Sequence, residues 1–169
     1  LSCSENKLTS LDVSNNTALT YLVCNSNYLT RLDVSNNTAL TYLSCSENKL
    51  TSLDVSNNTA LTGLYCDGNQ LTSLDLSNNT TLYSFYCFDN LLTRLDLRNG
   101  NNANFVIGEF SWMNNPNLTC IFVDDTSYST ANWTNIDTTS TFVEDDAACN
   151  VLSIEDNTFG LGVSVYPNP

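Results

Sequence analysis

The sequence predicts a solenoid of stacked parallel strands, mainly β in content and closed by a C-terminal cap. Three observations support this prediction. A unit of 21 residues recurs along the first 101 positions, apolar residues alternate within each unit, and the repeat gives way to an aromatic segment near the C terminus. Units of roughly 20 to 50 residues are typical of solenoids, in which each unit buries its apolar face only against its neighbours.

The repeat keeps one register through five turns. Complete copies begin at Leu19, Leu40 and Leu61, the first copy is truncated, and the last, residues 82–101, is degenerate. The copy that begins at Leu40 has the sequence LTYLSCSENKLTSLDVSNNTA. Because no residue is inserted between the complete copies, equivalent side chains of successive turns should lie above one another.

Each copy contains two short segments in which apolar and polar residues alternate, as in strands with one buried face. In the copy that begins at Leu40, the apolar residues of the first segment are Leu40, Leu43 and Cys45, and those of the second are Leu50, Leu53 and Val55. We therefore expect both walls of the coil to be strand-like. Turns stacked about 4.8 Å apart would then enclose a continuous apolar interior.

The consensus LxxLxCxxNxL, followed by LTxLDV, resembles the leucine-rich repeat, in particular a 21-residue bacterial variety with a cysteine in its strand. The resemblance covers residues 1–101. It implies a right-handed solenoid with the first strand of each turn on the concave side, a surface that this family commonly uses to bind ligands.

One column of the repeat consists of thiols spaced 21 residues apart: Cys3, Cys24, Cys45, Cys66 and Cys87. Zinc needs ligands that converge tetrahedrally, whereas these side chains should be parallel and point into an apolar wall. Parallel neighbours are also poorly oriented for disulfides. We therefore expect the cysteines to pack as small buried apolar groups, and we expect no metal.

A second column consists of asparagines that follow each cysteine by three residues: Asn6, Asn27, Asn48, Asn69 and Asn90. They stand where the chain turns out of its strand and leaves backbone groups without strand partners, which amide side chains can satisfy. The family resemblance also implies an asparagine ladder. Its role is therefore expected to be structural.

A third column consists of carboxylates on the wall expected to be convex: Asp12, Asp33, Asp54, Asp75 and Asp96. Stacked carboxylates repel one another unless something offsets their charge. Calcium is one alternative. The favoured alternative is hydrogen bonding from neighbouring Ser, Thr or backbone groups, with local charge from Arg31 and Arg94.

Differences between the copies gather on the outward positions of the first strand and on its exit. The candidate ligand-binding residues on this concave face are Tyr21, Tyr42, Glu47, Tyr65, Asp67, Tyr86, Phe88 and Asp89. Solvent-facing aromatic residues on a rigid sheet commonly anchor interfaces, and they can also stack on sugar rings. The alternative interpretation is that tyrosine simply suits a half-buried strand surface.

Residues 102–149 are expected to form a cap, because the last turn of a solenoid exposes its core. The segments NPNLTCIFVDD and YSTANWTNID resemble the terminal element found behind this type of repeat, and Leu118, Cys120 and Val123 would continue its strand pattern. In such an element a cysteine commonly follows the aromatic region. On this resemblance we expect Cys120 and Cys149, which stand outside the thiol column, to form a disulfide; two free thiols are the alternative.

The final seven residues, VSVYPNP at 163–169, resemble the opening of the C-terminal sorting domain carried by cargo of the bacterial type IX secretion system. The resemblance implies a bacterial protein that is secreted or attached to the cell surface, with residues 150–162 as a linker. The chain opens in the middle of a repeat, and we expect it to be a piece of a longer protein.

Composition narrows the range of partners. The chain carries 18 acidic and 5 basic residues, a formal net charge of −13, and so lacks the basic footprint that nucleic acids require. No apolar run approaches the roughly 20 residues of a membrane-spanning helix, so no membrane insertion is expected. We expect a monomer with a protein or glycan ligand.

The sequence offers no catalytic constellation. It has no histidine, no GxSxG elbow and no glycine loop for phosphate, so we expect neither an enzyme nor a cofactor. The predicted function is that of a binding module that recognises a protein or polysaccharide through the concave aromatic face. The alternative is a structural spacer or adhesin stalk that presents other domains at the cell surface.

Overall fold

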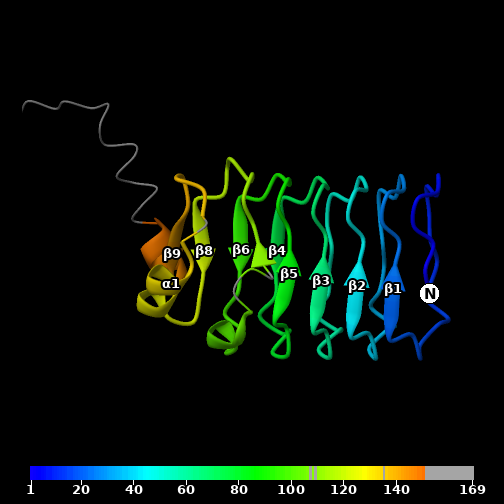
Figure 1. The fold of residues 1–169 in the computed structure, drawn as a ribbon, viewed down its shortest axis with the longest axis horizontal. Coiled ribbons are helices and arrows are strands. Elements are labelled where there is room, and N and C mark those ends of the chain that lie inside the picture. The colour runs from blue at the N-terminus through cyan, green and yellow to red at the C-terminus, as the bar shows by residue number, and fades with distance from the viewer. Residues whose placement is uncertain (107, 109, 135, 151–169) are drawn as a thin grey trace, which may run out of the picture.

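The computed structural model describes residues 1–106, 108, 110–134 and 136–150. The chain forms an elongated stack of turns, with the N terminus at one end and the aromatic cap at the other (Figure 1). The predicted solenoid of stacked parallel strands is confirmed, and it has about six turns. The predicted linker and sorting segment lie outside the described residues, except for Asn150.

The first sheet consists of five parallel strands in the order β1-β2-β3-β5-β7. Their bounds are Tyr21–Val23 for β1, Tyr42–Ser44 for β2, Gly63–Tyr65 for β3, Ser84–Tyr86 for β5 and Phe110–Ser111 for β7. From β1 to β5 the register advances by one repeat per strand, and Leu43 pairs with Leu64. At the last strand Phe85 pairs with Phe110, because a longer connection follows the final repeat.

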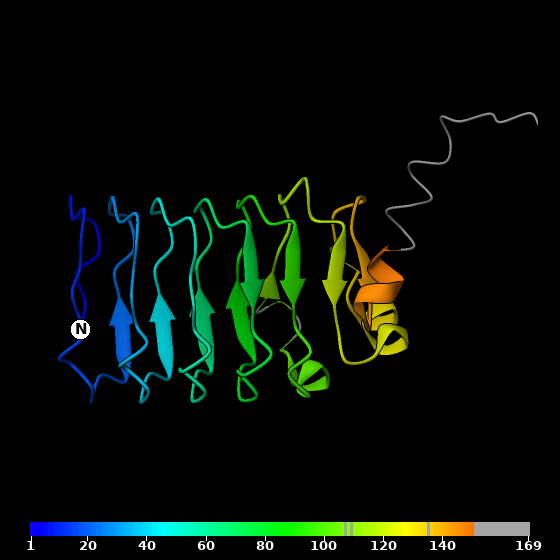
Figure 2. The same ribbon diagram turned by 180° about the vertical axis from the view of Figure 1, so that it is seen from behind.

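The second sheet lies across the core and has the order β4-β6-β8-β9, again all parallel. Its strands are β4, Ser73–Asp75; β6, Arg94–Asp96; β8, Cys120–Phe122; and β9, Thr141–Val143. Figure 2 shows that β4, β6 and β8 run in the opposite direction to β1, β2 and β3. Each turn therefore crosses the core and returns.

The expectation that both walls are strand-like throughout is wrong for the N-terminal turns. Residues 8–13, 29–34 and 50–55 supply buried side chains but form no strands. The N–H group of Lys49 donates to the carbonyl oxygen of Leu29 at 2.8 Å, but residues 50–55 are not assigned to a strand. A polar cleft of about 340 Å³ opens between two turns here, lined by residues 31–33, Ser35, Ser52 and Asp54.

The core consists of columns of like residues, as the repeat predicts. Leu22, Leu43, Leu64 and Phe85, the central residues of four first-sheet strands, are fully buried. The thiols of Cys24, Cys45, Cys66 and Cys87 are also buried, and Cys3, in the first turn, is half-buried. The solenoid thus has an interior of like residues stacked on like residues.

Aromatic side chains close the C-terminal end of this core. The 3-10 helix η1, Asn102–Asn104, and the helix α1, Thr126–Asn132, lie in this region, and Asp125 caps α1 by accepting from the N–H group of Tyr128 at 2.9 Å. Trp112 and Trp133 are buried, with ring centroids 5.4 Å apart. The cap covers apolar surface that another repeat would otherwise cover.

One expectation about the cap is corrected by the register of β8. Leu118 and Val123 join the core as predicted, but Cys120 does not. Ile121 pairs with Leu95 of β6 and takes the inward position instead. Because side chains alternate along a strand, Cys120 faces the other side of the second sheet.

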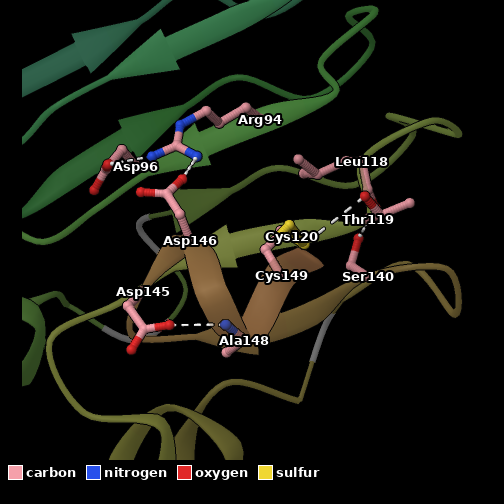
Figure 3. The surroundings of a disulfide bond; sticks show 10 residues. All are labelled: Arg94, Asp96, Leu118, Thr119, Cys120, Ser140, Asp145, Asp146, Ala148 and Cys149. Carbon is pink, nitrogen blue, oxygen red and sulfur yellow. Dashed lines mark hydrogen bonds and ion pairs between the residues drawn. A yellow bond between two sulfur atoms is a disulfide. The ribbon is translucent and has the colours of Figure 1, made fainter. Parts of the chain in front are cut away.

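On that side, Cys120 is joined to Cys149 by a disulfide between residues 29 positions apart (Figure 3). Arg94 lies with its guanidinium carbon 3.6 Å from the centre of the Phe122 ring and donates to Asp146 Oδ1 at 2.6 Å. The disulfide and this arginine attach the last described segment to the second sheet.

The asparagine column joins each turn to the preceding one. The side-chain amide of Asn48 donates to the carbonyl oxygens of Cys45, at 3.0 Å, and of Cys24 in the turn before, at 3.1 Å. Its oxygen Oδ1 accepts from the N–H group of Leu29 at 3.0 Å. Asn27, Asn69 and Asn90 repeat this pattern, and Asn115 continues it into the cap.

A second asparagine ladder runs through the closing SNN of each repeat and was not predicted. Asn37, Asn58 and Asn79 are fully buried, and the amide of Asn58 donates to the carbonyl oxygens of Val34 and Asn37 in the turn before, at 3.0 and 2.9 Å. Each of the three complete repeats is therefore tied to the turn before it at two places.

Asn48→Ala should lower the free energy of unfolding by about 3 kcal/mol, because it leaves buried backbone groups of two turns without partners. Asn57→Ala is the matched control: Asn57 is exposed and makes one long bond to Ser35, so its loss should cost less than about 0.5 kcal/mol. Urea unfolding of both variants measures the difference. Equal losses would contradict the role given to the ladder.

The disulfide should be detectable by peptide mapping without reduction, as a linked pair of peptides containing Cys120 and Cys149. Cys149→Ser should destabilise the chain by roughly 3 kcal/mol, because an open loop regains conformational entropy on unfolding. Cys3→Ser, which removes a half-buried free thiol, is the control and should cost much less. Recovery of both cysteines as free thiols would contradict the pairing.

Candidate functional site

The outward face of the first sheet is determined by strand alternation. The central residue of each strand faces the core, so the first and third residues face outward. Tyr21 and Tyr42 occupy the first position of their strands, whereas Tyr65 and Tyr86 occupy the third. All four tyrosines predicted as ligand-binding residues therefore lie on one face.

These four rings form a continuous stack, referred to below as the tyrosine stack. The ring centroids of Tyr21 and Tyr42 are 4.6 Å apart, those of Tyr42 and Tyr65 5.2 Å, and those of Tyr65 and Tyr86 5.3 Å. The angles between successive ring planes are 11°, 35° and 24°. Phe88 packs edge-on against Tyr86 at 6.1 Å. The spacing is close to that between neighbouring strands, which places one ring above each strand.

Gly63 allows the stack to pass from the first position of the strands to the third. It pairs with Tyr42, while Tyr65 pairs with Ser44, so the stack shifts by two residues between β2 and β3. A Cβ atom at Gly63 would lie 3.1 Å from Cδ2 of Tyr42 and 3.4 Å from Cε2 of Tyr65. The missing side chain therefore leaves room for the Tyr42 ring to lean toward Tyr65.

Hydrogen bonds hold this face in place. The hydroxyl groups of Tyr65 and Ser84 are 2.9 Å apart, and the Tyr86 hydroxyl donates to the carbonyl oxygen of Gly108 at 2.8 Å. Burial raises the pKa of the Tyr42 phenol, with a further contribution from the neighbouring Tyr65 and Tyr21. Its environment therefore favours the neutral form of the phenol, which is also the form of an ordinary tyrosine at neutral pH.

Three carboxylates, referred to below as the acid row, follow the strands on their exit turns: Glu47, Asp67 and Asp89. Glu47 and Asp89 have left-handed backbone angles, with φ of 54° and 52°. A Cβ atom at Gly68 would lie 2.7 Å from Glu47 Oε1, so the Glu47 carboxylate lies against that glycine. Asp67 accepts from the Ser46 hydroxyl at 2.7 Å, and Asp89 accepts from the Asn114 amide at 2.8 Å.

The structure thus brings all eight predicted ligand-binding residues onto the first sheet and its exit turns. Tyr21 is 49% exposed, whereas Tyr42, Tyr65 and Tyr86 are half-buried by their neighbours. Glu47 and Asp89 are exposed, and Asp67 and Phe88 are half-buried. Whether this face binds a ligand remains a prediction.

Sequence reasoning missed several members of this surface. Asn25 accepts from the Ser44 hydroxyl at 2.7 Å, and Gly63 allows the rings to stack. Both positions lie in the columns that vary between copies, so the signal was present. The consequence of a glycine beside a tyrosine needed the three-dimensional register.

The aspartate column is held by hydrogen bonds. Hydrogen bonds from the hydroxyl and N–H group of the serine two residues later lower the pKa of Asp12, Asp33 and Asp54. Asp96 differs because it is buried: burial alone would raise its pKa, but hydrogen bonds and charge from Arg98, together with Arg94, lower it overall. Among the described residues, no group of three or more His, Cys, Asp or Glu side chains is placed to hold a metal ion.

The thiol column is unsuited to nucleophilic chemistry. Burial raises the pKa of Cys24 to about 12 and that of Cys45 and Cys66 well above the ordinary value for a thiol. These thiols therefore stay protonated at neutral pH. Because only a thiolate is a good nucleophile or metal ligand, they are unreactive.

Comparison with solved structures shows similarity to two proteins of Listeria monocytogenes. The chain is 34% identical to the functional domain of InlJ from Listeria monocytogenes, whose structure is described as including a cysteine ladder; the match covers 72% of this chain and 30% of that chain, with a TM-score of 0.61. An internalin from the same species, InlF, matches at 18% identity over 82% of this chain and 53% of that chain, with a TM-score of 0.46. The chain therefore spans 30% and 53% of the chains in these two structures.

Two further comparisons are limited. Residues 20–43 match the LVIVD repeat family, which is a small part of the chain. No curated protein matches the chain in sequence.

Among the residues that the structure describes, no helix is long and apolar enough to cross a membrane. The InlJ match supports an internalin-like leucine-rich-repeat fold.

Gly63→Val should disrupt the tyrosine stack without unfolding the chain, because the added methyl groups would collide with the Tyr42 ring. We expect a weaker near-ultraviolet circular dichroism signal from coupled tyrosines and an unchanged far-ultraviolet spectrum. Ser73→Val, at an exposed position of β4, is the control and should leave both spectra unchanged. An unaltered tyrosine signal in the Gly63 variant would argue against the stack.

The buried thiols should resist iodoacetamide at about pH 8.5 while the chain is folded, because the thiolate fraction and solvent access are both low. Mass spectrometry of peptides should find Cys24, Cys45, Cys66 and Cys87 unmodified, and the half-buried Cys3 modified. All five should react after unfolding in urea. Rapid modification of the four buried thiols in the folded chain would contradict their burial.

Proposed function

We propose that this chain, a leucine-rich-repeat solenoid that resembles the Listeria internalins, is a non-enzymatic binding module that recognises a protein or glycan through the tyrosine stack and the acid row. The observation that carries the proposal is the continuous row of four stacked tyrosine rings on one face of a rigid sheet. Tyrosine is among the residues that most often dominate binding energy at interfaces.

The rigidity of this face supports recognition. Tyr42 and Tyr65 are each held between two other rings, and the hydroxyl of Tyr65 is hydrogen-bonded to that of Ser84. Side chains that are already ordered lose little conformational entropy when a ligand binds. A preformed aromatic surface therefore retains more of its contact energy as affinity.

The alternative function is a spacer or adhesin stalk that presents other domains. Near-identical repeats tied together by two asparagine ladders favour it, because such a stack is a stiff rod. The two functions differ in what they require of the first sheet. A spacer needs no tyrosine stack, and its function would not change if these rings were removed.

The setting proposed for this module is the bacterial exterior, secreted or attached to the cell surface. The similarity to InlJ and the VSVYPNP segment support this. We propose the arrangement expected from the sequence: repeats at 1–101, a cap at 102–149, a linker at 150–162 and the start of a sorting domain at 163–169. Exported proteins commonly carry disulfides, and the Cys120–Cys149 bond is consistent with that setting.

The binding proposal is tested with a glycan array and a panel of purified surface proteins, each probed with the unaltered chain and with the double variant Tyr42→Ala, Tyr65→Ala. The double variant should lose at least about tenfold in affinity for any ligand captured, because it removes two adjacent anchors. Thermal unfolding should show that it remains folded, since neither ring belongs to the core.

Two variants serve as controls. Tyr65→Phe keeps the ring and loses only the hydroxyl, and Tyr28→Ala removes an exposed tyrosine outside the stack. Both should retain most of the affinity. A ligand bound equally well by the double variant and the unaltered chain would support the spacer function instead.

A further inference from the structure

We propose that the tyrosine stack and the acid row together recognise a basic protein surface, one that presents arginine or lysine side chains, and that they do not recognise a glycan. This inference rests on the proposed function and narrows its ligand to one class. It is carried by two independent features of the face, the orientation of the rings and the distribution of charge.

The ring orientation disfavours sugars. A sugar ring packs its C–H groups against the open face of an aromatic ring, where the π electrons concentrate negative charge. Tyr42 has Tyr21 on one face and Tyr65 on the other, and Tyr65 lies between Tyr42 and Tyr86. Each inner ring therefore has a neighbouring ring on both sides, which leaves less of its face open to a ligand.

The two ends of the stack add little open ring face. Phe88 packs edge-on against Tyr86 and crowds that end. Among the described residues, Tyr21 keeps one face without another ring against it. A single open face at the edge of the sheet is a poor platform for a polysaccharide, which needs several, but it suits the planar guanidinium group of one arginine.

A row of edges and hydroxyl groups suits a protein. Protein side chains approach tyrosine from all directions, and edge-to-face contacts are favourable between aromatic groups. The stack extends across four neighbouring strands, from β1 to β5, so the contact surface is long and narrow. This shape matches an extended segment or the ridge of a folded domain.

The charge of the face selects a basic partner. The strands of the first sheet carry no charged residue, and Glu47, Asp67 and Asp89 follow directly on their exit turns. Asp67 lies two residues after Tyr65 and therefore on the same side of the extended chain. The carboxylates thus border the rings, where a cation on a docked partner would meet them.

Within the described part of the chain, no lysine or arginine forms an ion pair with this row. Ion pairs within the described ranges involve only Arg94 and Arg98 with Asp96 and Asp146, which are all at the second sheet and the cap. The hydrogen-bond partners of Asp67 and Asp89 are neutral groups, Ser46 and Asn114. The negative potential of the face is therefore available to steer and hold a basic partner.

The test combines a random peptide-display library with a glycan array, both probed with the intact chain. Binders are kept only if they fail to bind the folded Tyr42→Ala, Tyr65→Ala variant. Peptides that pass this filter should be enriched in arginine and lysine, and no glycan should pass it. Their affinity should fall as salt concentration rises.

The acid row is tested with Glu47→Gln, Asp67→Asn, Asp89→Asn, a triple variant that removes the charge and keeps one acceptor oxygen at each position. It should weaken the selected peptides roughly tenfold. The matched control, Asp33→Asn, Asp54→Asn, Asp75→Asn, changes net charge equally on the opposite wall and should weaken them less than about twofold. This control separates a defined site from general attraction to an acidic chain.

The outcomes distinguish the two levels of the proposal. Tyrosine-dependent binding of glycans, or of neutral or acidic peptides, would overturn the basic-partner inference and leave the binding function standing. Equal losses in the two triple variants would also overturn the inference. An absence of tyrosine-dependent binders in both arms would overturn the proposed function itself.

Discussion

Each buried asparagine that follows a cysteine hydrogen-bonds to the carbonyl oxygens of two consecutive turns, and this contact holds the turns in register. In Asn48 the amide reaches the carbonyl oxygens of Cys45 and Cys24, and the side-chain oxygen holds the N–H group of Leu29. The same contacts persist across the longer turn before the cap, where Asn115 follows Trp112 by three residues and reaches the carbonyl oxygen of Cys87. The spacing of three residues between the end of the strand and the asparagine is therefore a condition for satisfying buried polar groups of both turns.

The binding face depends on the same constraint. Because the turns keep one register, β1, β2, β3 and β5 lie side by side with equivalent residues paired. The distance between strands is close to the separation of stacked aromatic rings, so outward tyrosines on successive strands meet without distortion. The cysteine and asparagine ladders keep the same residue type in successive repeats. The outward positions of the strands are not bound by this constraint, and their residues differ from turn to turn.

Much of the fold and part of the site could be predicted from the sequence. The leucine, cysteine and asparagine columns follow from a fixed period, and the eight candidate residues lie together because alternation and period place them on one face. The ring geometry could not be predicted, because Gly63 contributes by the absence of a side chain. The ladder of Asn37, Asn58 and Asn79 was overlooked because SNN resembles an ordinary turn.

The cap was predicted less well because the period ends there. Once connection lengths vary, alternation alone does not determine which residues pair, and so Cys120 was assigned to the core although Ile121 occupies that position. The N-terminal part of the second wall shows a related effect. Its sequence alternates like that of a strand, but residues 8–13, 29–34 and 50–55 form no strands.

The most direct test of the register is to insert an extra turn and measure urea unfolding. A variant in which residues 40–60 are duplicated should fold with at least the stability of the parent chain, because the new turn stacks in register on both sides. A second variant carries the same duplication but lacks Ser46 in the inserted copy. The asparagine of that copy then follows its cysteine by two residues instead of three. We expect a loss of several kcal/mol for this second variant relative to the first. Equal stability of the two would show that the asparagine contact does not hold the turns in register.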